Sequence, residues 1–263
     1  MKFCSLSSGS RGNCQYLETK YMKVLIDAGL SARKIEHFLD HIGVHPSQID
    51  YIFVTHEHMD HIQGVGPLSR RYNIPIVASF GTWMAMEKIV GKIPDENRCV
   101  FSPGEECSLG DLDFMPFHIY HDAVDPVGFA FYHEKKKAIV LTDSGIVTPE
   151  MKKIICRADL YLIEANHDPL MLEKGPYPRQ LKQRIASDYG HLSNEISGKV
   201  LSEVLKGERE VILLGHLSEE NNIPKVALNT VARYLTNRGL DIRKDLRIGC
   251  ARVEHPSPLI ALE

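Results

Sequence analysis

The sequence has no long apolar run and little net charge. No apolar stretch in its 263 residues approaches the ~18 residues that a membrane-spanning helix needs. The first residues, 1–5, also lack the apolar segment of a secretory signal. The formal net charge of −3 gives no general attraction for nucleic acid, so such a partner would have to be recognised by a local patch. We therefore expect a soluble, cytoplasmic protein without membrane contact.

Paired cysteines, repeats and linkers are also missing from the sequence. The six cysteines are dispersed and form no C-x-x-C pair, which argues against a zinc ribbon and indicates reduced, mostly buried thiols. No low-complexity tract or repeat divides the chain. Since α/β folds of this length are common as one unit, we predict a single domain over residues 1–263.

The most informative segment is the run HEHMDH at residues 56–61. It follows the apolar run 51–55, so three imidazoles and a carboxylate are expected in a tight turn at the end of a buried strand. Imidazole nitrogen and carboxylate oxygen are ligands of Zn²⁺, and Mn²⁺ accepts the same set. His56 and His58 can point to one side of the turn while Asp60 and His61 point to another. The run therefore favours two adjacent ions over one, and a solvated histidine turn is the alternative.

The order of apolar segments predicts an α/β fold. Short strands come first, and segments with apolar residues at helical spacing then alternate with further strands. A second set of strands, followed by the same alternation, occupies the second half of the chain. Two sheets with helices on their outer faces would bury both sets of strands in a four-layer αββα sandwich. We expect strands at residues 1–6, 14–17, 23–26, 51–55, 74–78, 160–164 and 210–214, and a run of strands over 98–142 that includes 112–119, 127–132 and 137–141. We expect helices at residues 64–72, 149–156, 178–187, 193–205 and 223–237, one that Ser31 caps and one from Thr82 to Ile89.

Further ligand candidates occur where three later strands stop. These segments are 118–122, 141–145 and 213–216, and each carries a histidine or an aspartate. A lone residue of this kind is usually a turn former. Together with the run 56–61, however, they supply the additional ligands that a dinuclear site needs. Spacing alone does not decide between His118 and His121.

These residues resemble the metallo-β-lactamase fold superfamily. Its motif order is an early aspartate, H-x-H-x-D-H, a histidine, an aspartate and a final histidine, and the chain matches it over nearly its whole length. Within the superfamily the chain looks most like the YycJ (WalJ) type of bacterial exonuclease. The segments that carry both similarities are Asp27, 56–61, His121, Asp143 and His216, with 8–13, 121–129, 164–168, 190–194 and 216–222.

The resemblance implies two divalent metal ions, Zn²⁺ or Mn²⁺, and a set of ligands. The first ion would be held by His56, His58 and His121, the second by Asp60, His61 and His216, and Asp143 would bridge both. Asp27 would orient a ligand histidine, as metal-bound imidazoles usually require. His121 matches the family position, whereas we expect His118 to be a packed, hydrogen-bonded residue of the strand.

Two such ions can hold a bridging hydroxide that attacks a phosphodiester. We therefore assign Asp60 and Asp143 to the catalytic machinery, together with His191, which precedes a helix start and would bind phosphate or protonate the leaving group. The alternative is that His191 only packs over the helix end. Candidate substrate contacts are Ser10, Asn13, Arg184, Ser193 and Asn194. Arg184 belongs to a basic helix with Arg179 and Lys182, which is equally typical of a solvated face.

The resemblance implies a 5′→3′ exonuclease on double-stranded DNA with a role in DNA repair. The alternative is a small-molecule hydrolase of the same fold that cleaves a thioester, lactone or cyclic phosphodiester. A β-lactamase is disfavoured because the sequence shows no secretory signal. A ribonuclease with a large capping domain is disfavoured because the segment from Asp143 to His216 must build part of the core.

Overall fold

The computed structural model describes residues 1–262, and in these residues the strands form two seven-stranded sheets. The first sheet has the order β14-β1-β2-β3-β4-β5-β6. Its strands are β1 (Lys2–Ser7), β2 (Cys14–Glu18), β3 (Lys23–Ile26), β4 (Tyr51–Phe53), β5 (Ile76–Ser79), β6 (Arg98–Phe101) and β14 (Ile260–Ala261). The second sheet has the order β13-β12-β11-β10-β9-β8-β7. Its strands are β7 (Cys107–Leu109), β8 (Leu112–His118), β9 (Val127–His133), β10 (Lys136–Leu141), β11 (Leu160–Glu164), β12 (Glu210–Gly215) and β13 (Leu246–Cys250).

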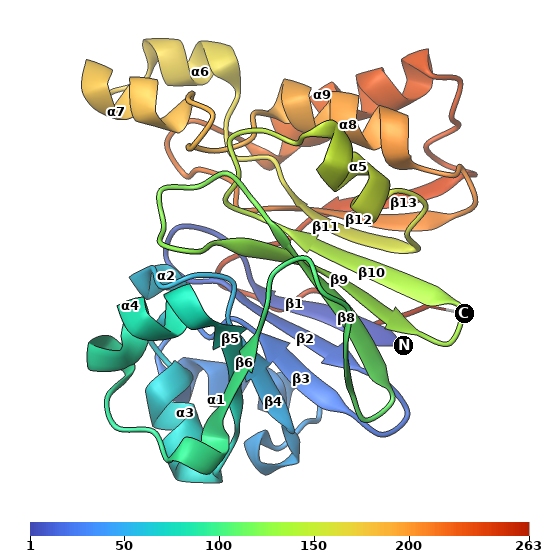
Figure 1. Cartoon of the computed structure of the whole chain (residues 1–263). Coiled ribbons are helices and arrows are strands. Elements are labelled where there is room, and N and C mark those ends of the chain that lie inside the picture. Colours follow the sequence, from blue (N-terminus) through green and yellow to red (C-terminus); the bar gives the residue numbers. More distant parts are fainter. Residues whose placement is uncertain (263) are drawn as a thin grey trace.

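Helices cover the outer face of each sheet, as Figure 1 shows. The first sheet carries α1 (Ala32–His41), α3 (Val65–Tyr72) and α4 (Phe80–Val90), with the short α2 (Met59–Ile62) at one end. The second carries α5 (Pro149–Ile155), α8 (Asn194–Val204) and α9 (Pro224–Asn237). The helices α6 (Pro169–Lys174) and α7 (Arg179–Ile185) lie together at the same end of the sandwich as α2, on the left in Figure 1. No helix of the described residues is both long and apolar enough to cross a membrane.

Three apolar clusters hold the four layers together. Between the sheets, the Phe53 ring meets Phe114, Phe129 and Phe131 edge-on at centroid distances of 4.9, 5.5 and 5.4 Å. A second cluster joins the first sheet to α1, α3 and α4, and a third joins the second sheet to α5, α8 and α9. The layered α/β architecture predicted from the sequence is confirmed.

Several local predictions differ from the structure. The helix expected to start at Thr82 begins at Phe80, because the Ser79 hydroxyl accepts the Thr82 N–H and caps the helix one turn earlier. His118 is not packed, since it ends β8 with its side chain 65% exposed and 3.7 Å from the Asp125 carboxylate. The cysteines are free, as expected, but only Cys4 and Cys14 are buried.

Candidate metal centre

Three imidazoles converge at the carboxyl ends of β4 and β8. His58 Nδ1 lies 3.2 Å from His56 Nε2 and 3.3 Å from His121 Nε2. Depending on the tautomers, these rings can hydrogen bond to one another or direct three lone pairs at a shared cation. Three nitrogens are a common zinc ligand set.

A second group of ligand atoms adjoins the first. Asp60 Oδ2 lies 3.6 Å from His61 Nε2 and 3.9 Å from His216 Nε2, and Asp143 Oδ2 lies 3.3 Å from His61 Nε2. Asp143 also approaches the first group, since its carboxylate can share an ion with His56 and His61. The buried Oδ2 of Asp143 and Nε2 of His216 have no hydrogen-bond partner among the described residues. Buried polar atoms are normally satisfied, so these two fit the role of metal ligands.

Asp27 holds one of these histidines in place. It accepts a hydrogen bond from the Thr55 N–H at 2.9 Å, and its Oδ2 lies 2.7 Å from His61 Nδ1. This contact leaves Nε2 of His61 directed at Asp60 and Asp143. The position agrees with the orienting role that the resemblance implies for Asp27.

Glu164 is a functional candidate that the sequence analysis missed. It is fully buried at the end of β11, and its Oε1 lies 2.8 Å from His191 Nδ1 and 2.9 Å from His216 Nδ1. Its Oε2 accepts the backbone N–H groups of Ser144 and Leu192, both at 3.1 Å. One carboxylate therefore orients His191 and His216 together. Its place at a strand end was a usable signal, because the other candidates also follow strands.

Burial and neighbouring charges shift the pKa values of these groups in opposite directions. Burial lowers the pKa of His216, but the carboxylates of Asp143 and Glu164 raise it to about 10. Burial raises the pKa of Glu164, but His191 and His216 lower it to about 2, so the carboxylate is ionised. Burial and the adjacent His61 hold the pKa of His56 well below its usual range, which keeps its ring neutral and available as a ligand.

Three of the site residues have a left-handed backbone. Asp27, Asp143 and His216 follow β3, β10 and β12 with φ of 61°, 58° and 50°. This region is unfavourable for side chains other than glycine. At these strand ends Asp27 Oδ2 lies 2.7 Å from His61 Nδ1, and Asp143 Oδ1 lies 2.9 Å from His216 Nδ1.

Comparisons with known proteins agree with this arrangement. A family model described as the Beta-lactamase superfamily domain matches residues 22–216. The chain belongs to this superfamily. All of the proposed ligands, from His56 to His216, lie inside the matched range.

Two curated relatives are similar to this β-lactamase superfamily member over nearly its whole length. It is 43% identical over 260 residues to Exodeoxyribonuclease WalJ of Streptococcus pneumoniae, with 98% of this chain and 97% of that protein covered. It is 38% identical over 248 residues to Exodeoxyribonuclease YycJ of Bacillus anthracis, with 94% of each covered. The metallo-β-lactamase fold protein YhfI from Bacillus subtilis shares the fold, with a TM-score of 0.74, 15% identity and coverage of 97% and 98%. The resemblance to YycJ-type proteins is confirmed.

A cavity of about 180 Å³ lies beside the metal centre of this β-lactamase superfamily member. Ser10 and Arg184, two of the predicted substrate contacts, line it together with His191 and His216. His191 Nδ1 is bonded to Glu164, so its Nε2 is the ring nitrogen left for other partners. Arg184 bonds to the Asp122 carboxylate through Nε at 2.6 Å and Nη2 at 2.5 Å.

The other three predicted substrate contacts lie inside the protein. Asn13 is 1% exposed, and its amide lies 3.0 Å from His61 Nε2 and 3.2 Å from the Gly9 carbonyl. The Ser193 hydroxyl accepts the Ile196 N–H and caps α8, and the Asn194 amide pairs with the amide of Asn222. We therefore do not retain these residues as substrate contacts. Small polar residues in loops look alike in sequence whether they face a ligand or the protein interior.

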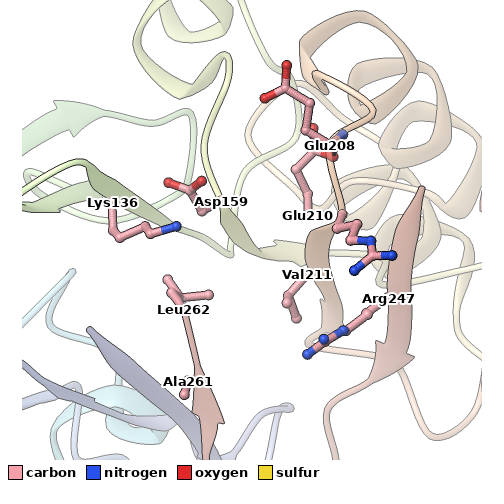
Figure 2. Close-up of a pocket in the computed structure, with 9 residues that line it drawn as sticks. Lys136, Asp159, Glu208, Glu210, Val211, Arg247, Ala261 and Leu262 are labelled. Atoms are coloured by element: carbon pink, nitrogen blue, oxygen red, sulfur yellow. Dashed lines mark hydrogen bonds between the residues drawn. The ribbon is translucent and has the colours of Figure 1, made fainter. Parts of the chain in front are cut away.

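A different cavity, of about 260 Å³, lies at the opposite ends of the strands (Figure 2). Lys136, Arg247 and Leu262 are among its lining residues, and no histidine is. Two of its three acidic residues already have partners: the Asp159 carboxylate lies 3.0 Å from Lys206 Nζ, and Glu210 accepts backbone N–H groups. Its composition does not match a metal centre, so the chemistry belongs at the histidine-rich end.

Proposed function

We propose that the chain is a metal-dependent exodeoxyribonuclease that acts 5′→3′ on double-stranded DNA with two divalent ions, Zn²⁺ or Mn²⁺. The observation that supports this most strongly is the meeting of two ligand groups at Asp143 in a chain that matches exodeoxyribonucleases along nearly their full length. In this proposal His56, His58 and His121 would hold one ion, Asp60, His61 and His216 would hold the other, and Asp143 would be shared by both. A role in DNA repair stays a prediction from the resemblance.

The ions, when bound, supply Lewis-acid chemistry, because they lower the pKa of water and offset the negative charge that develops on a phosphate. The protein contributes orientation. Asp27 and Glu164 hold His61, His191 and His216 through their Nδ1 atoms, so each ring presents Nε2 to the site.

His191 is the proposed proton donor or phosphate ligand. Burial lowers its pKa, but the Glu164 carboxylate outweighs burial and raises it above that of a free imidazole. Since Nδ1 is bonded to Glu164, a proton at Nε2 can be donated to a phosphate oxygen or to the leaving oxygen.

The test uses duplex DNA that is labelled separately at its 5′ and 3′ ends, with protein loaded with Mn²⁺ or with Zn²⁺. We expect early loss of the 5′ label by the wild type and none by His58→Ala, which removes one nitrogen of the first group. His118→Ala is the matched control, because this exposed histidine lies outside both ligand groups. An absence of cleavage with both ions bound would contradict the proposal and favour a small-molecule hydrolase.

A further inference from the structure

The cavity beside His191 carries three hydroxyl groups from three separate segments. Ser10 comes from the loop after β1, Tyr177 from the link between α6 and α7, and Ser218 from the loop after β12. Within residues 1–262, the hydroxyls of Ser10 and Tyr177 have no hydrogen-bond partner. Ser218 Oγ accepts the Asn221 N–H at 3.1 Å, which leaves its own proton to donate. All three can therefore donate to an anion in the cavity.

Arg184 adds positive charge to the same cavity. Two of its nitrogens, Nε and Nη2, are bonded to Asp122, and the remaining N–H groups are available to a ligand in the cavity. Hydroxyl donors beside a guanidinium are typical partners of phosphate oxygens. The Asp122 carboxylate also fixes the place of Arg184, because its other oxygen lies 3.4 Å from His121 Nε2.

The size of the cavity selects a small ligand. At about 180 Å³ it is smaller than the roughly 300–1,000 Å³ of sites that enclose drug-sized molecules. A phosphate group fits this space. A nucleic-acid strand that continued through the cavity would have to place a whole nucleoside in it, which needs more room. The wall formed by α7 is tightly packed, since a Cβ added at Gly190 would lie 2.3 Å from the Arg184 carbonyl oxygen.

We propose that this cavity binds the terminal 5′-phosphate of the DNA strand, and that Ser10, Tyr177, Ser218 and Arg184 make the enzyme selective for 5′-phosphorylated ends. The cavity shares His191 and His216 with the metal centre. A terminal phosphate bound there therefore leaves the adjoining phosphodiester next to the ligand groups. This inference rests on the proposed exonuclease function and adds the chemical state of the end that the enzyme accepts.

The experiment compares kcat/KM on one duplex that carries either a 5′-phosphate or a 5′-hydroxyl. We expect the wild type to prefer the phosphate at least 10-fold. Tyr177→Phe and Ser218→Ala should each reduce this preference by roughly 10-fold, the usual effect of losing a hydrogen bond to a charged group. Tyr189→Phe is the matched control, because Tyr189 is exposed and does not line the cavity, and its preference should equal that of the wild type.

The outcomes separate the two proposals. If the wild type cleaves neither duplex, the exonuclease function itself fails. If it cleaves both at equal rates, that function stands and the phosphate cavity is wrong. A preference that survives in both Tyr177→Phe and Ser218→Ala would place the phosphate elsewhere and would also overturn the inference. Inhibition of the wild type by a 5′-mononucleotide and by inorganic phosphate would support the proposal, and inhibition by neither would count against it.

Discussion

Replacing Glu164 by glutamine tests the central hydrogen-bond network of the site. Each carboxylate oxygen faces two donors: Oε1 faces Nδ1 of His191 and His216, and Oε2 faces the N–H groups of Ser144 and Leu192. A glutamine has one oxygen and one NH₂ group. With its NH₂ group towards Ser144 and Leu192, the amide faces two backbone donors and loses two hydrogen bonds. With its NH₂ group towards His191 and His216, it keeps them only if both rings carry their proton on Nε2, which removes the lone pair that His216 would offer an ion.

The size of the effect follows from this count. A hydrogen bond to a charged group contributes roughly 1.5–3 kcal/mol, so the loss of two amounts to about 3–6 kcal/mol, which is partly offset because a buried charge is removed. We expect the free energy of unfolding of the metal-free protein to fall by about 3 kcal/mol. Because Glu164 orients His216, the metal affinity should fall roughly 10- to 100-fold.

Glu210→Gln is the matched control. This carboxylate is also buried, but its Oε1 accepts the N–H groups of Lys206 and Gly207 and its Oε2 accepts only that of Glu208. A glutamine can keep its oxygen at the Oε1 position and lose one hydrogen bond, so the loss of stability should be smaller. Urea denaturation with a chelator measures stability, and competition with a metal indicator measures affinity. Glu164→Gln binding metal as tightly as the wild type, or being no less stable than Glu210→Gln, would refute the reasoning.

Two further predictions test packing and thiol chemistry. Gly29→Ala should displace the loop that carries Asp60 and lower the thermal midpoint, because the added Cβ would lie 1.6 Å from the Asp60 carbonyl oxygen. Gly249→Ala is the control and should unfold like the wild type, because no atom lies within 4 Å of its added Cβ. Equal thermal midpoints for the two variants would contradict this prediction. Burial raises the pKa of Cys250 from its ordinary 9.0 to about 11, and only the thiolate reacts, so alkylation at pH 8 should be roughly 100-fold slower than for an exposed thiol. Mass spectrometry after timed iodoacetamide treatment measures this rate, and a rate equal to that of glutathione would contradict the expectation.

Most of the fold could be predicted because long, strongly periodic segments dominate it. The strands β11 and β12 are buried along their whole length, and their apolar runs are visible in the sequence. The elements that sequence analysis missed have weak signals. In β13 only Leu246 is buried, β14 spans two residues, and α6 spans six. These elements form through pairing and packing with neighbours that are distant in sequence, which local patterns do not encode.

The candidate site could be predicted in part, for a related reason. Its ligands follow strands of both sheets that stop at the same end of the sandwich, so strand order and the packing of the two sheets together bring His56, Asp143 and His216 close. Glu164 was missed because it ends a fully buried strand and its importance lies in partners 27 and 52 residues away. A buried carboxylate needs hydrogen-bond donors or positive charge to compensate for its lost hydration, and in this protein His191 and His216 supply them.

The left-handed backbone at Asp27, Asp143 and His216 shows where an ion matters most. A left-handed conformation costs roughly 1–2 kcal/mol for a residue other than glycine, and glycine at these positions would remove the side chain that the site uses. At Asp27 the cost is offset within the protein, because both carboxylate oxygens are hydrogen bonded to Thr55. At Asp143 and His216 it is not fully offset, because Oδ2 of the first and Nε2 of the second lack a partner among the described residues. Strain and unsatisfied polar atoms thus coincide at these two residues, so the ion that the proposal places between them should stabilise the fold as well as supply the chemistry.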